Sequence, residues 1–284
     1  MIKAIDRVLA ARDKDRPKIT DYVEHLFTDF FEQKGDGLGK EDGSIYGGIG
    51  LFHGQSVTII GHRKGKSTEE NIRCNFGMSG PEGYRKALRL MKQAEKFHRP
   101  IITFIDTPGA YPGIEAETNG QSQAIAANLA AMSSIAVPIV TIVTGEASSG
   151  GALGIGVANR IYMLENAVYE ILSPEGFASI MWRDSSLKDT AAEMMKLTAE
   201  DILSFGLVDG IITESGAGIA SVEMGRRTVE KGDVSVLYDR VDETLYKALS
   251  ELREMSSEEL LTDRFEKFRS FDRRFLSGEF YRNL

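Results

Sequence analysis

The chain has 284 residues, of which 42% are hydrophobic, and this length supports one large domain or two small ones around a buried core. Its 42 acidic and 34 basic side chains give a formal net charge of −8, which disfavours sequence-independent binding to nucleic acid or to an anionic membrane. The single cysteine, Cys74, excludes an intramolecular disulfide, and the sequence has neither a long apolar run nor a signal-peptide pattern. We therefore expect an unexported protein in a reducing cytoplasm.

The four histidines are scattered over the N-terminal third without the spacing of a metal site, and we expect each of them at the surface or in a turn. They are His25, His53, His62 and His98. We expect no metal ion in this chain.

Hydrophobic periodicity and turn residues predict two helices, a β-hairpin and a third helix in the first hundred residues. Pro81 stands at a favourable first-turn position for the third helix. The expected elements are helices at Met1–Ala11 and from Asp21 to Phe31, strands at Ser44–Phe52 and Gln55–His62 joined by His53-Gly54, and a helix at Glu82–Phe97.

Two successive units then combine a short apolar strand, a glycine-containing loop and a helix. Such units predict parallel strands with helices packed outside them, and so an α/β fold. The first unit comprises Pro100–Asp106, Thr107–Gly113 and Gln121–Ser134, and the second comprises Pro138–Thr144, Gly145–Ser149 and Gly150–Val157.

The remaining chain predicts short strands and helices, and we expect helix from Ala220 onward. The stretch Arg264–Arg274 carries five basic and two acidic side chains with interleaved phenylalanines, which fits a packing helix better than a surface for an acidic partner. We predict an N-terminal helical segment (1–40), a core (41–215) and a C-terminal helical region (216–284). The other expected elements are strands Arg160–Leu164, Val168–Leu172 and Leu207–Ile212, and helices Pro174–Trp182, Thr190–Leu197 and Ala199–Phe205.

Both glycine-containing loops leave the carboxyl ends of predicted strands, where α/β proteins bind ligands. Gly150 and Gly151 stand where a helix begins, so their N–H groups are candidate donors to a developing oxyanion, although paired glycines also serve close helix–strand packing. Three nearby carboxylates are candidate acids or bases, although solvated loop carboxylates are commoner. They are Glu115, Glu117 and Glu146.

Other common chemistries fit the same loops poorly. Gly145 lies three residues before Ser148 instead of two, and no histidine follows His98, so a Ser-His-Asp hydrolase is hard to assemble. The glycines at 151, 154 and 156 lack dinucleotide-binding spacing, and no phosphate-binding P-loop sequence occurs.

Five long strings resemble the alpha subunit family of bacterial acetyl-coenzyme A carboxylase carboxyltransferase. By this resemblance, we expect the chain to lack part of the N-terminal helical extension seen in longer members. The strings are RPKITDYVEHLF from Arg16, GGIGLFHGQSVTIIGHRKG from Gly47, NFGMSGPEGYRKALRLMKQAEKF from Asn75, ITFIDTPGAYPGIEAE from Ile102, and GEASSGGALGIGVANRIYMLENAVYEILSPEGFASIMW from Gly145.

The resemblance implies a crotonase-like fold, a spiral of ββα units with helical additions at both ends. It also implies carboxyl transfer from carboxybiotin, held on the biotin carboxyl carrier protein, to acetyl-coenzyme A, which gives malonyl-coenzyme A for fatty-acid synthesis. By resemblance, Gly150 and Gly151 bind the ureido oxygen of biotin, Gly109 and Ala110 supply a second donor, and Tyr111 contributes to the cofactor site. The released biotin takes the methyl proton, so no strong protein base is needed.

The family also implies partners. A beta subunit carries a four-cysteine zinc ribbon and most of the acyl-coenzyme A site, and the two chains form an alpha-two, beta-two assembly within a complex that includes biotin carboxylase. We expect this chain alone to be inactive. Arg85 and Arg183 are candidate partners for the carboxylate of carboxybiotin.

The sequence leaves two other hypotheses open. A crotonase-type hydratase or decarboxylase acting alone on an acyl-coenzyme A keeps the fold but needs a pair of carboxylates aimed at the substrate. An assembly or nucleic-acid-binding role through Arg264–Arg274 is disfavoured by the net charge.

Overall fold

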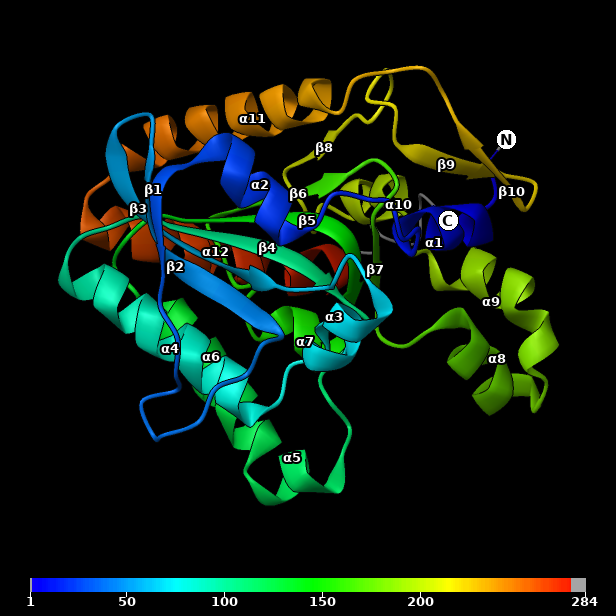
Figure 1. Ribbon diagram of the computed structural model, residues 1–284, viewed down its shortest axis with the longest axis horizontal. Helices are drawn as coiled ribbons and strands as arrows, with labels where there is room; N and C mark the ends of the chain where they lie inside the picture. Colours follow the sequence, from blue (N-terminus) through cyan, green and yellow to red (C-terminus); the bar gives the residue numbers. More distant parts are fainter. Residues whose placement is uncertain (1, 277–284) are drawn as a thin grey trace.

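An eight-stranded mixed sheet forms the centre of the structure, a computed structural model that describes the backbone of residues 2–276 and the side chains of residues 2–271 (Figure 1). Its strands are β1 (Thr28–Glu32), β2 (Ile45–Phe52), β3 (Gln55–His62), β4 (Ile101–Thr107), β5 (Ile139–Ser148), β6 (Arg160–Leu164), β7 (Val168–Glu170) and β8 (Gly210–Ile212). The order is β1-β2-β3-β4-β5-β6-β8, and β7 pairs with the carboxyl end of β5. The pairs from β3 onward are parallel, whereas β1, β2 and β3 pair antiparallel.

Helices cover both faces of the sheet. They are α1 (Ala4–Ala11), α2 (Ile19–Leu26), α3 (Thr68–Arg73), α4 (Pro81–Lys96), α5 (Ile114–Thr118), α6 (Gln121–Ser134), α7 (Ser149–Leu153), α8 (Pro174–Trp182), α9 (Lys188–Met195), α10 (Ala199–Ser204), α11 (Ser235–Arg253) and α12 (Ser257–Leu276). In Figure 1, α4 and α6 lie on one face of the sheet, and α2 and α11 lie on the other. Helix α4 connects β3 to β4 and α6 connects β4 to β5, so the carboxyl ends of these parallel strands meet at one edge.

The predicted hairpin and the two predicted buried strands are confirmed. His53 and Gly54 join β2 to β3 with φ values of 48° and 76°, the paired positive φ of a two-residue type I′ turn. Every residue of β4 and β5 is buried, as expected for strands covered on both faces.

The prediction of a helix from Asp21 to Phe31 is wrong beyond Leu26. Phe27 is extended, and residues Thr28–Glu32 form β1, an edge strand that pairs antiparallel with β2. The phenylalanines that gave the helical pattern also favour a strand, and pairing with β2 decides between the two.

The prediction of continuous helix from Ala220 is also wrong, because β9 (Ala220–Glu223) and β10 (Arg226–Val229) form a separate hairpin before α11 begins. Met224 and Gly225 make its turn with φ values of 49° and 73°. Their N–H groups donate to the carboxylate of Asp6 at 3.0 and 2.8 Å, so the hairpin is anchored on α1.

The start of the basic stretch packs inside the molecule. Arg264 on α12 is buried and donates to the carbonyl oxygens of Ile135 at 2.8 Å and Val137 at 3.0 Å, and to Oδ1 of Asn159 at 2.6 Å. Lys267 pairs with Asp209. The packing interpretation is therefore confirmed at these two positions, whereas the side chains of residues 272–274 lie outside the described part. The proposed boundaries after residues 40 and 215 stay a prediction.

Candidate active site at the carboxyl ends of β4 and β5

The loops after β4 and β5 touch each other at two glycines. A Cβ atom added to Gly151 would lie 2.5 Å from the carbonyl carbon of Gly109 and 2.6 Å from the nitrogen of Ala110. Real side chains do not approach backbone this closely, so the contact requires glycine at position 151. The structure thus brings together the two loops that the sequence singled out.

Three backbone N–H groups at this contact have no acceptor among the described residues. They belong to Ala110, Gly150 and Gly151. The neighbouring donors are already used, because Gly109 donates to Oγ1 of Thr107 at 3.1 Å and Tyr111 donates to the carbonyl of Ser79 at 2.9 Å. Ala110 is therefore the free donor of the first loop, and Gly150 and Gly151 are the free donors of the second.

A strained residue sets the direction of the N–H groups of Gly150 and Gly151. Ser149 joins β5 to α7 with φ at 55°, a left-handed conformation that a non-glycine residue adopts at a cost of about 1–3 kcal/mol. Helix α7 is shorter than predicted and ends at Leu153. The sharp turn leaves the first-turn N–H groups of this helix without carbonyl partners.

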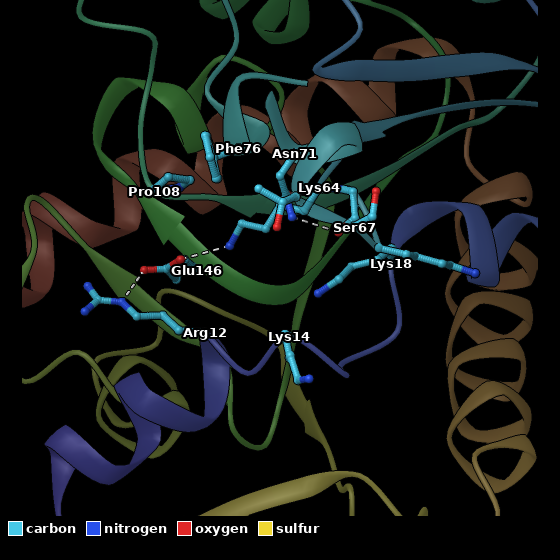
Figure 2. Close-up of a pocket in the computed structure, with 12 residues that line it drawn as sticks. Arg12, Lys14, Lys18, Lys64, Ser67, Asn71, Phe76, Pro108 and Glu146 are labelled. Carbon is cyan, nitrogen blue, oxygen red and sulfur yellow. Dashed lines mark hydrogen bonds and ion pairs between the residues drawn. The ribbon is translucent and has the colours of Figure 1, made fainter. Parts of the chain in front are cut away.

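A buried charge cluster lies beside these loops. Lys64 Nζ binds Oδ1 of Asp106 at 2.7 Å. It also binds Oε2 of Glu146 at 2.9 Å, and Arg12 Nε binds Oε1 of Glu146 at 2.6 Å (Figure 2). Burial opposes the charge on Lys64, but the two carboxylates raise its pKa well above the usual value. Burial alone would raise the pKa of Asp106, whereas Lys64 and Lys18 lower it. Asp106 and Lys64 are therefore a permanently charged pair at neutral pH.

Gly145 allows Asp106 to reach this position. A Cβ atom at residue 145 would lie 2.3 Å from Oδ1 of Asp106, and that oxygen also accepts the N–H of Glu146 at 3.1 Å. The glycine before Glu146 is thus required by the close approach of a neighbouring side chain.

The candidate carboxylates differ in burial and in their partners. Glu146 is buried and held by Lys64 and Arg12, whereas Glu115 and Glu117 are exposed on α5. Sequence reasoning missed Glu170 at the end of β7, opposite Ser148 of β5. Burial, with a further contribution from Glu146, raises the pKa of Glu170 to about 7.

A cavity of about 610 Å³ opens beside the cluster, with residues from the N-terminal segment, the 64–76 region and both loops in its wall (Figure 2). Its wall is formed by Arg12, Lys14, Lys18, Lys64, Gly65, Lys66, Ser67, Thr68, Asn71, Phe76, Pro108 and Glu146. Neither Arg85 nor Arg183 is among them. Arg85 pairs with Asp36 at 3.1 Å, and Arg183 is exposed at the end of α8.

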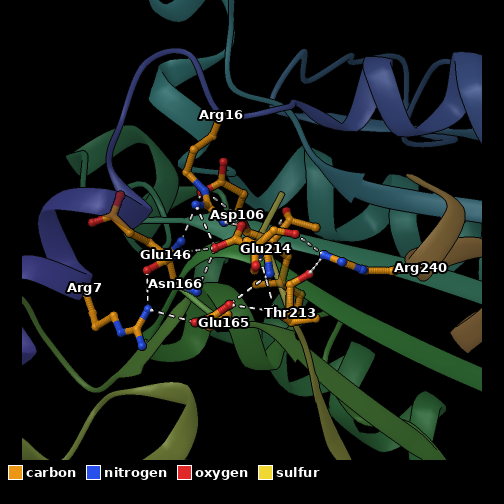
Figure 3. Close-up of polar contacts among 12 residues, drawn as sticks. Arg7, Arg16, Asp106, Glu146, Glu165, Asn166, Thr213, Glu214 and Arg240 are labelled. Atoms are coloured by element: carbon orange, nitrogen blue, oxygen red, sulfur yellow. Dashed lines mark hydrogen bonds and ion pairs between the residues drawn. The ribbon is translucent and has the colours of Figure 1, made fainter. Parts of the chain in front are cut away.

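A buried polar network holds the N-terminal segment against the strand ends (Figure 3). Arg16 is 3% exposed and donates to Glu214 and to the carbonyl of Thr144 at 2.9 Å. Glu214 also accepts the N–H of Asn166 at 2.9 Å, and Arg7 donates to Oδ1 of Asn166. The segment that carries Arg12 and Lys18 is therefore fixed in place.

His62 contradicts the expectation of surface or turn histidines. Its side chain is buried at the end of β3, and burial, aided by Lys64, lowers its pKa to about 3, so the imidazole is neutral at physiological pH. His53 lies in the β2–β3 turn, and His25 and His98 are exposed, as expected. Tyr111 lines a second, smaller cavity of about 210 Å³.

The described residues contain neither a membrane-spanning helix nor a cluster of metal ligands. None of the helices within residues 2–276 is long and apolar enough to cross a membrane. In the same part of the chain, no group of three or more His, Cys, Asp or Glu side chains is arranged to hold a metal ion.

Residues 1–272 match the family described as acetyl co-enzyme A carboxylase carboxyltransferase-like. The chain belongs to this family. It is 53% identical over 269 residues to the acetyl-coenzyme A carboxylase carboxyl transferase subunit alpha of Bacillus subtilis (strain 168), covering 95% of this chain and 79% of that protein. The corresponding subunit of Staphylococcus carnosus (strain TM300) is 51% identical over 268 residues, covering 94% and 82%. The resemblance to the alpha subunit family is confirmed.

Solved structures share the fold at low sequence identity. A transcarboxylase 12S structure matches 89% of this chain and 45% of its own, with a TM-score of 0.66 and 18% identity. A Pseudomonas malonate decarboxylase hetero-tetramer matches 83% of this chain and 90% of its own, with a TM-score of 0.62 and 20% identity. The predicted crotonase-like α/β fold of this family is thereby confirmed.

Proposed function

We propose that this chain is the carboxyltransferase alpha subunit of an acetyl-coenzyme A carboxylase and that its two glycine loops form the biotin side of the active site. The transfer runs from carboxybiotin on a biotin carboxyl carrier protein to acetyl-coenzyme A and gives malonyl-coenzyme A. The observation that carries the assignment of the site is the set of three free N–H groups where the loops meet.

The residues present fit a biotin group. Gly150 and Gly151 offer two N–H donors that no protein acceptor takes among the described residues, and the ureido group of biotin offers an oxygen. Phe76 and Pro108 give the neighbouring cavity apolar wall, and its cations suit a carboxylate. When bound, the carboxylated biotin supplies the carboxyl group that is transferred.

In this proposal the chain works through fixed donors. Gly150 and Gly151 donate to the ureido oxygen, where negative charge increases in the transition state, and Ala110 supplies the donor of the first loop. Lys64 holds Asp106 and Glu146 in position, and His62 stays neutral at physiological pH. Both carboxylates are held in ion pairs with Lys64 or Arg12, which fits a transfer that needs no strong protein base. Tyr111 stays a prediction as a contact of the cofactor.

A beta subunit completes the site in this proposal. Large apolar side chains on and next to α8 are unusually exposed, with Ile171 at 80%, Ile180 at 73% and Met181 at 56%. Exposed apolar patches of this kind mark protein interfaces. We assign this surface to the beta subunit, which supplies the zinc ribbon and the acyl-coenzyme A site in an alpha-two, beta-two assembly. The complex works with biotin carboxylase in the cytoplasm.

Reconstitution tests the function. We expect purified chain and cognate beta subunit together to convert malonyl-coenzyme A and a biotin derivative to acetyl-coenzyme A and carboxylated biotin, and each chain alone to be inactive. A stable complex without transfer activity, or full activity of this chain alone, contradicts the proposal. Hydration or decarboxylation of an acyl-coenzyme A by this chain alone would establish the competing reading.

A charge placed on α8 tests the interface. Ile180→Glu is expected to abolish assembly with the beta subunit in size-exclusion chromatography, because burying an unpaired carboxylate is costly. Leu38→Glu is the matched control, since Leu38 is 76% exposed and far from α8 in the sequence. Normal assembly of the Ile180→Glu chain refutes the assigned interface.

A further inference from the structure

The cavity beside the two loops carries an excess of positive charge. Five of its wall residues are cationic and one is acidic. The cations are Arg12, Lys14, Lys18, Lys64 and Lys66, and the acid is Glu146. In ligand cavities, a few polar groups fix the orientation of the ligand. A cation that has no carboxylate partner within the protein is available to bind a ligand in this way.

Three of the five cations already have carboxylate partners. Lys64 binds Asp106 and Glu146, and Arg12 binds Glu146 and, at 3.2 Å, Glu175. Lys66 pairs with Asp21 of α2. These ion pairs balance much of the cavity's charge and hold its wall.

Lys18 is different, because its ammonium group has no hydrogen bond or ion pair to any described residue although the residue is only 6% exposed. Its backbone is fixed at the start of α2, where its N–H donates to Oδ2 of Asp21 at 2.8 Å and its carbonyl accepts the N–H groups of Asp21 and Tyr22. Lys14, the other cation without a carboxylate, is exposed to solvent.

An ammonium group on a largely buried side chain that faces a cavity and lacks an anion is costly, since burial removes part of its water without replacing those contacts. Burial accordingly lowers the pKa of Lys18, although Asp106 acts in the opposite direction. An anion that entered the cavity would restore the missing partner. We propose that this cavity is an anion subsite in which Lys18 Nζ binds a carboxylate or phosphate oxygen of a substrate.

The inference rests on the proposed function, which supplies two sources for such an oxygen. One source is the carboxylate that is transferred, and the other is the phosphate groups of coenzyme A. The cavity borders both loops through Pro108 and Glu146, so its position is compatible with either source. Lys18 is a binding residue in either case, and its loss weakens the binding of anionic ligands selectively.

Calorimetric titration of the assembled alpha–beta complex tests this assignment with three probes. Coenzyme A carries phosphates without the carboxylate, malonyl-pantetheine carries the carboxylate without phosphates, and acetyl-pantetheine carries neither. Lys18→Met is expected to weaken one anionic probe about tenfold, as for loss of one charge-assisted hydrogen bond, and to leave acetyl-pantetheine unchanged. Lys18→Arg is expected to retain most of the binding. Lys247→Met, at an exposed lysine on α11, is the control for loss of a lysine elsewhere.

The outcomes distinguish the two sources of the anion, and they distinguish failure of the subsite from failure of the proposed function. Weaker binding of coenzyme A identifies the phosphate, and weaker binding of malonyl-pantetheine identifies the carboxylate. Unchanged binding of both, or an equal loss for acetyl-pantetheine, overturns the subsite. If Lys18→Met does not fold, Lys18→Gln replaces it. Carboxyl transfer by the wild-type complex is measured in parallel, so that failure of the proposed function is distinguished from failure of the subsite.

Discussion

Adding one methyl group at Gly151 tests whether the contact between the two loops supports catalysis. The new Cβ would lie 2.5 Å from the carbonyl carbon of Gly109, whereas carbon atoms in contact are normally at least about 3.5 Å apart. The loops must therefore separate by about 1 Å, and a misplacement of this size costs on the order of a hundredfold in rate. Loss of one oxyanion donor has a similar effect, about 3–4 kcal/mol in the transition state.

We therefore expect Gly151→Ala to lower kcat for carboxyl transfer about a hundredfold in the reconstituted complex, with a smaller change in KM. Gly150→Ala should lose much less, because the nearest atom to its added Cβ is Cδ1 of Ile125 at 3.6 Å. Gly47→Ala in β2 is the packing control, since its Cβ would lie 2.7 Å from Cδ1 of Leu90 on α4, away from the loops. A folded, assembled Gly151→Ala complex with wild-type kcat would refute the reasoning.

Three further predictions concern buried charge. Lys64→Met leaves Asp106 and Glu146 without their shared cation, so we expect about 3–5 kcal/mol lower free energy of unfolding by denaturant titration, and an unchanged value contradicts the cluster. Arg264→Met should lower the melting temperature because several buried acceptors lose their donor, and a melting temperature equal to wild type would show that the contacts contribute nothing. Because burial raises the pKa of Glu170 from 4.5 to about 7, the folded state holds a proton there that the unfolded state has released, and stability falls as pH rises through this window. Glu170→Gln should therefore gain stability relative to wild type between pH 5 and pH 8, and a pH-independent difference excludes this titration.

Much of the fold follows from local sequence signals. The alternation and turn residues around His53-Gly54 specify the hairpin, and the short β-branched runs at 101–107 and 139–148 specify buried parallel strands. The two wrong helix predictions, up to Phe31 and from Ala220, have a common cause. In both places the chain pairs with a distant partner, β2 for β1 and the carboxylate of Asp6 for the β9–β10 turn, and no local pattern encodes these contacts.

The site was only partly predictable for the same reason. The paired glycines after a predicted strand pointed to Gly150 and Gly151, whereas the pairing of β4 with β5 that brings the two loops together is known only from the structure. The charged residues came from four separate segments, and Lys18 and Lys64 look in sequence like ordinary surface lysines. Glu170 likewise gave no signal, because its burial depends on the pairing of β7 with β5. Burial and partner assignment require the three-dimensional structure.

A structure of the reconstituted alpha–beta complex with biotin bound tests the assigned biotin site directly. We expect the ureido oxygen to lie within hydrogen-bonding distance, about 3 Å, of the N–H groups of Gly150 and Gly151. A biotin whose ureido oxygen is bound by other groups, with these N–H groups facing solvent, would contradict this assignment.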